Sequence, residues 1–160
     1  MVTNIEIDEV KKWYERSLKL LSLRPRSISE IRKYLSRKQV PDALILQIID
    51  RLTSAKLLDD YAFAVWFVEN RQEFRPKATP VLKFELIRKG INREIIEEVL
   101  LRKLGSTGES AGAYKVAEKK WRILKGYNLQ EKKRKLQEFL WRKGYGRDIV
   151  RSILEKLQNK

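Results

Sequence analysis

The chain contains three copies of one short pattern, and this internal repetition restricts its possible folds more than any other feature. The copies read IRKYLSRKQV at residues 31–40, LKFELIRKGI at 82–91 and LQEFLWRKGY at 136–145, and they align without gaps at offsets of 51 and 54 residues. The segment RPRS at 24–27 also recurs as RPKA at 75–78, again at an offset of 51. A period of this length is typical of tandem repeats, in which each copy is one supersecondary unit.

The apolar positions predict three helices for each repeat. Every copy carries a pair of apolar residues four positions apart, the spacing of one helix face: Ile31 and Leu35, Leu82 and Leu86, Leu136 and Leu140. A second apolar-periodic segment follows each copy and contains Leu44, Ile48 and Ile49, then Ile95, Val99 and Leu100, then Ile149, Ile153 and Leu154. Leading helices are expected at about residues 8–23, 59–74 and 111–126. We therefore predict an all-α fold of nine helices, arranged as three tandem helix-turn-helix or homeodomain-like repeats in an elongated, curved molecule.

The same alignment sets the domain boundaries. Residues 1–58 form the first three-helix repeat with an N-terminal extension, residues 59–104 form the second, and residues 105–160 form a linker and the third. The linker, GSTGES at 105–110, is expected to be the only flexible stretch, because glycine and serine favour irregular backbone.

Short polar signals mark the ends of several helices. Ser27 followed by Glu30 predicts a capping box, and Asp59 and Asn92 are predicted N-caps. Each pattern ends in a basic pair and a turn residue, and glycine at 90 and 144 suits the left-handed position after a helix. The first copy has glutamine at residue 39, which predicts a less relaxed turn there.

The helical spacing of the aromatic residues predicts that they lie in the core. Residues 61–68 are apolar all round, so we expect this helix to be covered on several sides and Trp66 to be enclosed. Trp13, near the chain end, is expected to contribute less to stability. Trp121 and Trp141 could stack on nucleic-acid bases, but core burial is the favoured interpretation.

Composition excludes several kinds of function. The sequence has no Cys and no His, which removes disulfides, Cys/His zinc sites, thiol nucleophiles and histidine bases. No phosphate-binding loop or metal-ligand spacing is present, so we predict a non-enzymatic protein without catalytic, metal or cofactor-binding residues. The longest apolar run, residues 62–68, is far short of the ~20 residues of a membrane span, and we expect a cytoplasmic monomer.

The formal net charge of +15 favours an anionic partner, nucleic acid first. The surplus is uneven, because 15 basic and 6 acidic groups leave +9 in residues 105–160, against +5 in residues 1–58 and +1 in residues 59–104. The candidate contacts are therefore mainly in the third repeat, with fewer in the first: Lys119, Lys120, Arg122, Lys132, Lys133, Arg134, Lys135, Arg142, Lys143, Arg147, Arg151, Arg24, Arg26, Arg37 and Lys38.

Each group of candidates also has a structural interpretation. The basic pairs at 37–38, 88–89 and 142–143 can stabilise helix C-termini as well as contact phosphates. The run at residues 132–135 can be a solvated helix face. On the third helix of the helix-turn-helix, Arg147 and Arg151 lie four residues apart, whereas the second repeat has three glutamates in that helix, so base reading by all three repeats is disfavoured.

These motifs resemble the bacterial RecX regulatory proteins over about residues 17–158. The resemblance rests on RPRS at 24–27 with Glu30, on LLDDYAFA at 57–64 with Asn70 and Arg71, and on ELIRKGI at 85–91. It implies three three-helix repeats and a non-enzymatic negative regulator that binds the RecA–DNA filament. Such a protein limits filament growth or stability and thereby inhibits RecA ATPase, strand exchange and co-protease activity. The partners it implies are RecA and, without sequence preference, single- and double-stranded DNA.

Two other classes of function stay open on the sequence. The first is a basic helix-turn-helix transcription or architectural protein that uses the third repeat to bind DNA. The second is a scaffold that binds protein only. Sequence-independent DNA binding would separate the RecA regulator from a transcription factor, and dependence on RecA would separate it from a scaffold.

Overall fold

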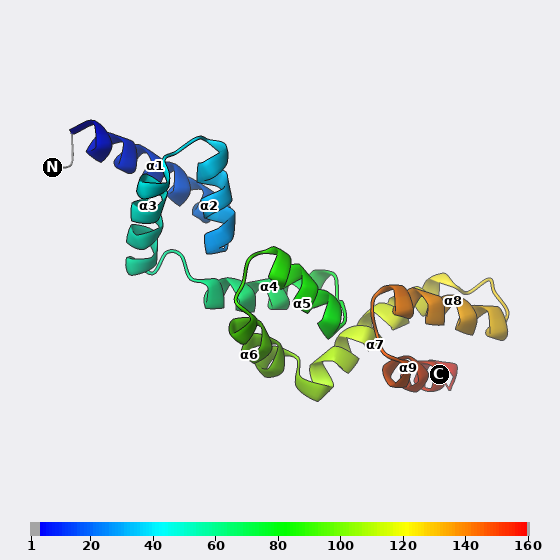
Figure 1. Ribbon diagram of the computed structural model, residues 1–160. Helices are drawn as coiled ribbons and strands as arrows, with labels where there is room; N and C mark the ends of the chain where they lie inside the picture. The colour runs from blue at the N-terminus through cyan, green and yellow to red at the C-terminus, as the bar shows by residue number, and fades with distance from the viewer. Residues whose placement is uncertain (1–3, 160) are drawn as a thin grey trace. The chain divides into compact units, whose positions relative to one another are not determined.

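The computed structural model describes residues 4–159, and within that range the chain forms nine α-helices and no strands (Figure 1). The first repeat comprises α1 (Asn4–Leu23), α2 (Ile28–Arg37) and α3 (Asp42–Ser54). The second comprises α4 (Asp60–Phe74), α5 (Thr79–Arg88) and α6 (Arg93–Lys103), and the third comprises α7 (Gly105–Ile123), α8 (Leu129–Arg142) and α9 (Arg147–Gln158). The predicted all-α fold of three-helix repeats is confirmed.

The helices form two compact units whose boundaries fall inside the second repeat. One unit contains the chain up to Trp66 together with Leu86–Ile96, and the other contains Phe67–Glu85 together with the residues from Glu97 onward. The division at residues 58 and 104, expected from the repeat alignment, stays a prediction.

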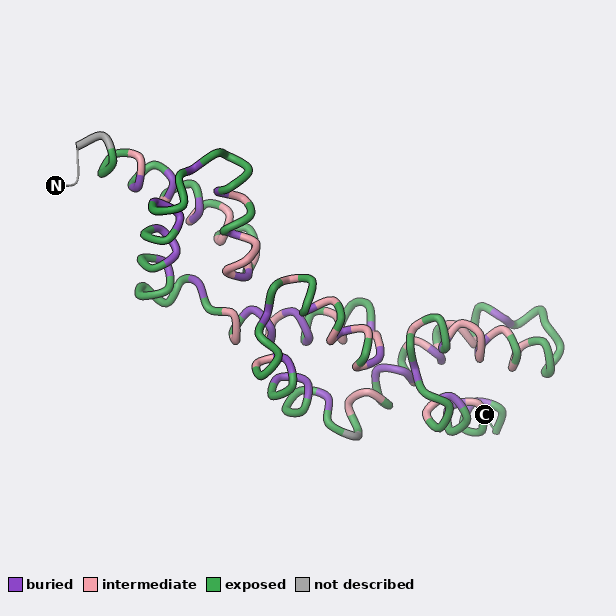
Figure 2. The backbone as a smooth tube through the Cα atoms, in the orientation of Figure 1, coloured by how far each residue is buried: buried purple, intermediate pink, exposed green. Residues whose placement is uncertain are grey.

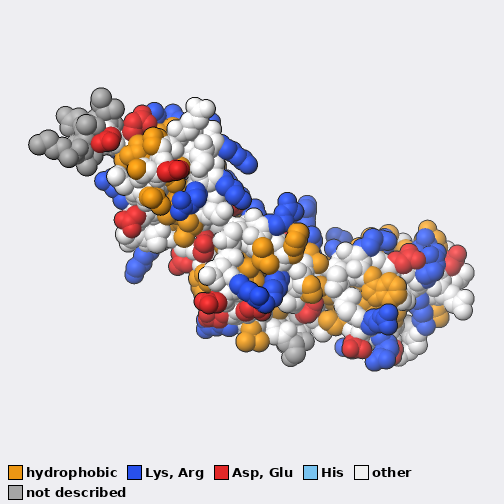
Figure 3. All heavy atoms as spheres, in the orientation of Figure 1, with side chains coloured by type: hydrophobic (Ala, Val, Ile, Leu, Met, Phe, Trp, Pro, Cys, Tyr) orange, Lys and Arg blue, Asp and Glu red, His pale blue; other side chains and the backbone are white. Residues whose placement is uncertain are grey.

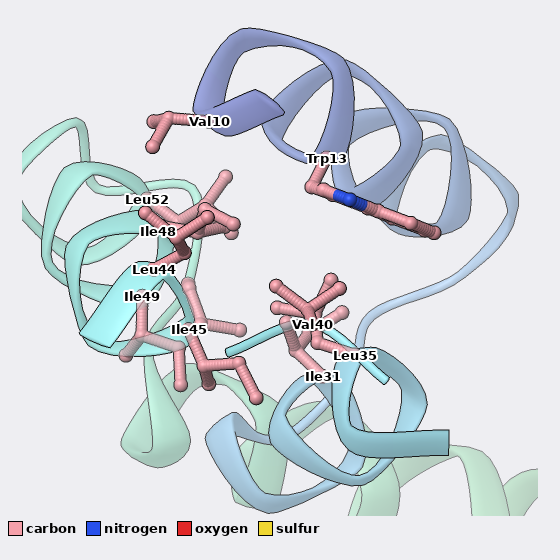
Figure 4. Packing of buried hydrophobic residues seen from close by; sticks show 11 residues of the cluster. Val10, Trp13, Ile31, Leu35, Val40, Leu44, Ile45, Ile48, Ile49 and Leu52 are labelled. Carbon is pink, nitrogen blue, oxygen red and sulfur yellow. The ribbon is translucent and has the colours of Figure 1, made fainter. Parts of the chain in front are cut away.

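The middle helix of every repeat buries its predicted apolar pair. Ile31 and Leu35, Leu82 and Leu86, and Leu136 and Leu140 are all 0% exposed. In the first repeat, side chains from α1, α2 and α3 converge on one cluster that includes Val10, Trp13 and Ile48 (Figure 4). Buried and exposed positions alternate along the helices accordingly (Figure 2).

Most of the predicted core face of the third helix is confirmed, since Val99, Leu100 and Ile153 are buried, but its first core position differs by one residue in two repeats. Ile96 and Val150 are buried, whereas Ile95 and Ile149, which the apolar pattern had placed in the core, are only half-buried. Adjacent apolar residues lie about 100° apart on a helix, so either could lead the buried stripe, and packing against the other helices selects one.

The predicted helix caps are present. The Ser27 hydroxyl accepts a hydrogen bond from the Glu30 N–H at 3.1 Å, and the Glu30 carboxylate accepts one from the Ser27 N–H at 3.2 Å. Asp59 accepts from the N–H groups of Tyr61 and Ala62. The Asn92 side chain accepts from the Glu94 N–H at 2.7 Å.

The turns after the three middle helices are all left-handed, with φ values of 58° at Gln39, 78° at Gly90 and 88° at Gly144. At the two glycines the turn also packs against the preceding repeat. A β-carbon on Gly90 would lie 2.4 Å from Ser29 Cβ, and one on Gly144 would lie 2.6 Å from Val81 Cγ2. Gln39 is exposed, so its turn has room for a side chain. The left-handed backbone of a non-glycine residue is strained, as predicted for this turn.

These contacts define a recurring repeat junction, in which the C-terminal turn of one middle helix meets the N-terminus of the middle helix one repeat earlier. The Lys89 carbonyl accepts a hydrogen bond from Ser27 Oγ at 2.7 Å. The Lys143 carbonyl accepts one from the Ala78 N–H at 3.3 Å. Each junction thus satisfies a carbonyl that the end of the helix leaves without an intrahelical partner.

The prediction of a flexible linker at residues 105–110 is wrong, because α7 begins at Gly105. Tertiary contacts override the composition of this segment. The Glu109 carboxylate accepts hydrogen bonds from the N–H and hydroxyl of Thr79, both at 3.0 Å, and Gly112 packs closely against Gln72.

The predicted roles of two tryptophans are also wrong. Helix α4 buries one broad face through Phe63, Ala64, Phe67 and Val68, and Trp66 on its flank is only half-buried. Trp13 is 7% exposed and belongs to the core of the first repeat. An apolar stretch therefore does not by itself show that a helix is covered on all sides. A residue near the chain end is buried when its helix packs along the whole repeat.

Candidate nucleic-acid interface

A groove of about 590 Å³ lies between α8 and α9 of the third repeat. It brings three of the predicted cations together with an exposed tryptophan and two carboxylates. The residues that line it are Lys133, Gln137, Trp141, Arg147, Asp148, Val150, Arg151, Leu154, Glu155 and Gln158. In the space-filling view, hydrophobic side chains bordered by Lys and Arg are visible over this repeat (Figure 3).

Helical spacing aligns the two walls of the groove. On α8, Lys133, Gln137 and Trp141 follow at intervals of four residues, and on α9 Arg147 and Arg151 have the same interval. Leu136 and Leu140, on the adjacent face of α8, are buried in the core and hold the helix in place. Side chains of the two walls therefore stand on rigid helices and face a common space.

Trp141 is 47% exposed and lines the groove, so its predicted burial is wrong. Its indole ring gives the groove a flat apolar surface beside three cations. Proteins that bind single-stranded nucleic acid combine aromatic rings, on which the bases stack, with cations that neutralise the phosphates. Trp121, in contrast, is half-buried and packs against the core of the third repeat.

The cationic run at residues 132–135 does not form one exposed cluster, because successive residues point about 100° apart around α8. Lys132 Nζ lies 3.9 Å from the centroid of the Trp121 ring, and Lys135 Nζ lies 4.5 Å from that of Tyr127. Arg134 is paired with Glu138 at 2.8 Å. Only Lys133 of the four lines the groove.

A second basic surface lies along α7 and the end of α8. Lys120 Nζ and Lys143 Nζ lie 5.5 Å and 5.2 Å from the centroid of the Phe139 ring. Burial lowers the pKa of Lys143, and the nearby charges of Lys77 and Arg75 lower it further. Lys119 and Arg142 are exposed, and Arg122 lies 3.5 Å from Glu118.

The predicted contacts of the first repeat have separate environments. Arg24 donates two hydrogen bonds to the Glu30 carboxylate, at 3.0 Å and 3.2 Å, and Lys89 donates a third at 2.8 Å. Arg26 and Arg37 line another pocket, and Lys38 is the exposed C-cap of α2. Arg24 therefore has a structural role, which the capping-box motif alone did not reveal.

The ion pairs of Glu30 predict a pH-dependent stability. Burial raises the pKa of Glu30, but the hydrogen bonds from Arg24, Lys89 and the Ser27 N–H outweigh it and lower the pKa from 4.5 to about 2. A carboxyl whose pKa is lower in the folded state stabilises the fold above its unfolded pKa and loses that effect as pH falls. We expect Glu30→Gln to lower the free energy of unfolding by about 1–2 kcal/mol at pH 7, allowing for solvent screening of the two cations.

Urea denaturation of the wild-type protein and the Glu30→Gln variant at pH 7, 4.5, 3 and 2 checks this prediction. The difference between the two proteins should shrink as the pH falls from 4.5 to 2. Glu15→Gln, a change at an exposed position of α1, serves as the control. A difference that stays constant down to pH 2 would contradict the role of the Glu30 charge.

The sequence reasoning missed the polar and acidic groups of the groove. Gln137, Asp148 and Glu155 line it, and Asp148 lies 3.6 Å from Arg151. Counting back from Trp141 in steps of four would have found Gln137 and Lys133. The acidic residues carry no such signal, because an isolated carboxylate in a helix is usually solvated.

The described part of the chain offers little for metal chemistry or membrane insertion. No group of three or more Asp or Glu side chains in residues 4–159 is placed to hold a metal ion. Among the helices in that range, none has the length and apolar character required to cross a bilayer.

Family models match the three repeats separately and in order. They are described as the first, second and third three-helix domains of RecX, and they match residues 14–52, 59–100 and 109–154. Together with the helix arrangement, they define a tandem three-helix-repeat protein with a basic groove in its last repeat. The chain belongs to the RecX family.

Relatives and solved structures agree with this assignment. The chain is 34% identical over 149 residues to Regulatory protein RecX of Bacillus licheniformis and 32% identical over 151 residues to that of Bacillus subtilis. These matches cover 93% and 94% of the chain but only 56% and 57% of the relatives, so the chain spans little more than half of their length. The crystal structure of RecX from Lactobacillus salivarius matches with a TM-score of 0.80 and 25% identity, covering 96% of this chain and 99% of that one.

A second solved structure, described as a crystal structure of regulatory protein RecX, matches with a TM-score of 0.77 and 26% identity. It covers 94% of this chain and 74% of the other.

Proposed function

We propose that this protein is a non-enzymatic negative regulator of the RecA recombinase. It binds the RecA–DNA filament and limits the growth or stability of that filament, and it thereby reduces ATP hydrolysis, strand exchange and co-protease activity. The observation that carries the proposal is the ordered match of all three repeats to the RecX domains. The net charge of +15 supports a partner that exposes phosphates and acidic protein surface.

The α8–α9 groove is the proposed contact with DNA. Lys133, Arg147 and Arg151 supply cations for phosphates, and Trp141 supplies a ring for stacking on an exposed base. Backbone phosphates and stacking are the same for every sequence, so this contact needs no operator. The groove therefore fits a protein that engages a filament wherever it forms.

Three linked repeats suit a partner that is itself repetitive. Once one module is bound, the linked modules act at a high effective concentration, provided that the partner presents further sites at a matching spacing. A filament of RecA on DNA is such a partner. We therefore expect inhibition at amounts well below one molecule for each RecA subunit.

Titration of RecA ATPase on single-stranded DNA tests the function. The intact protein should suppress hydrolysis, and a groove variant with Lys133→Glu, Arg147→Glu and Arg151→Glu should require at least a tenfold higher concentration. A control variant with Lys11→Glu, Lys19→Glu and Arg32→Glu makes the same change in net charge at exposed positions of the first repeat. Equal weakening by both variants would exclude a specific role for the groove, and absence of inhibition by the intact protein would overturn the proposal.

One observation favours a second candidate, a transcription or architectural protein of the helix-turn-helix type. Arg147 and Arg151 lie in α9, the third helix of its repeat and the helix that enters the major groove in such proteins. Competition between unrelated duplexes distinguishes the candidates. Preference for one sequence by a factor of 10³ or more would favour the transcription factor.

A further inference from the structure

A second pocket, of about 320 Å³, lies beside the junction between the first two repeats, within the unit that contains α2 and the end of α5. It is separate from the α8–α9 groove and far more polar in character, since five of its eight lining residues are cationic and one is acidic. The lining residues are Leu20, Arg26, Glu30, Lys33, Tyr34, Arg37, Arg88 and Lys89.

The single carboxylate of the pocket is fully used inside the protein. Glu30 Oε1 accepts from Arg24 Nη2 and Lys89 Nζ, and Oε2 accepts from Arg24 Nη1 and the Ser27 N–H. Glu30 thus balances Arg24 and Lys89. Arg26, Lys33 and Arg37 line the same space and take no part in this cluster.

Arg26 provides a second, independent observation at this pocket. Its Nε is buried and has no hydrogen-bond partner. A buried donor without a partner is unfavourable by about 1–3 kcal/mol, and an anion oxygen that accepted a hydrogen bond from Nε itself would remove that penalty. Three guanidinium groups in one pocket, those of Arg26, Arg37 and Arg88, match the oxygens of a phosphate more closely than lysines would.

We propose that this pocket binds a phosphate group of a polynucleotide backbone. The volume exceeds that of one phosphate and leaves room for the attached sugar, which Tyr34 and Leu20 can contact through their apolar surfaces. The site goes beyond the proposed regulatory function, since it requires neither RecA nor the α8–α9 groove. It gives the first repeat its own anchor on nucleic acid.

Nuclear magnetic resonance of the 160-residue chain tests this site without RecA. Tyr34 lines the pocket and its ring lies 6.5 Å from that of Trp13, so both residues report on occupancy. Inorganic phosphate, added at constant ionic strength against chloride, should shift the Tyr34 ring and Trp13 indole signals. A short oligothymidylate should shift the same signals in the background of the groove variant Lys133→Glu, Arg147→Glu and Arg151→Glu.

Substitutions define the site further. Arg26→Gln with Arg37→Gln should weaken both titrations at least tenfold, and Arg32→Gln, an exposed change on α2 outside the pocket, should leave them unchanged. Circular dichroism and the unperturbed spectrum verify that each variant is folded. Shifts with chloride alone, or equal weakening by Arg32→Gln, would overturn the site. Shifts with inorganic phosphate but not with the oligonucleotide would overturn the polynucleotide assignment while leaving RecA regulation untouched.

Discussion

Replacing Trp13 by alanine is expected to lower the free energy of unfolding by about 3–5 kcal/mol. The indole is buried among the side chains of the first repeat and packs edge-on against Tyr34. Its N–H donates to Glu9 at 2.9 Å, and the Arg16 guanidinium lies 4.7 Å from the ring centroid. The substitution therefore leaves a large cavity and removes an aromatic pair, a hydrogen bond and a cation–π contact at once.

Trp66→Ala is the matched control for this prediction. Trp66 is half-buried and contacts Phe63 with 5.7 Å between ring centroids, so its loss should lower the free energy of unfolding by about 1–2 kcal/mol. Urea denaturation followed by circular dichroism measures both variants. A larger effect for Trp66→Ala than for Trp13→Ala would show that the packing of the two tryptophans is described wrongly.

Binding of the full-length protein to DNA is expected to weaken about 10³–10⁵-fold between 50 and 200 mM salt. This range corresponds to roughly 6–10 neutralised phosphates, each of which releases condensed counterions on binding. The cations that the structure leaves in the groove, in the pocket beside the first junction and on α7 suffice for contacts of that number. The affinity should be similar for unrelated sequences, because phosphates carry no sequence information.

The groove variant makes this prediction quantitative. Removal of three phosphate contacts by Lys133→Glu, Arg147→Glu and Arg151→Glu should reduce the slope of log affinity against log salt concentration by about 2.7 on duplex DNA. The control Lys11→Glu, Lys19→Glu and Arg32→Glu should change the affinity through net charge and leave the slope close to that of the wild type. Fluorescence anisotropy over a salt series provides the slopes. A flat salt dependence of the wild-type protein would contradict phosphate binding altogether.

The sequence was sufficient for those parts of the fold that depend on neighbouring residues. The buried pairs such as Leu35 and Leu86 follow from helical periodicity, and the caps at Ser27, Asp59 and Asn92 follow from short-range hydrogen bonding. Left-handed turns at Gly90 and Gly144 follow from glycine after a basic pair. Each of these features is determined within about one helical turn of chain.

The wrong predictions concern features that depend on residues distant in the sequence or on the rotation of a whole helix. Glu109 finds its partner in Thr79, 30 residues away, and this contact helps hold the first turns of α7 in a segment that composition marks as a linker. Trp141 has the spacing of a core residue, but it lies about 100° around α8 from Leu140. Which of these two residues faces the core follows only from the register of the whole helix. The same rotation separates the four cations at residues 132–135.

The cationic pocket beside the first junction was partly foreseen. Arg26 and Arg37 are among the predicted contacts, whereas Lys33 and Arg88 are not. Lys33 lies four residues before Arg37 on α2, and Arg88 belongs to α5 and joins them only in the folded protein. Arg24 is a predicted contact as one of the cations of the first repeat. The structure shows instead that Arg24 pairs with Glu30 through two hydrogen bonds, and that Lys89 of the next repeat binds the same carboxylate.

The repeat junctions also determine how the chain loses its structure. The Lys89 carbonyl and ammonium groups both bind residues of the first repeat, so the end of α5 and the start of α2 are held by the same few interactions. In a linear array, cooperativity is the sum of such nearest-neighbour couplings, and the size of the unit that melts together depends on the weakest of them. Loosening the junction between Ser27 and Lys89 would let the first two repeats unfold in separate steps, even with every core residue in place.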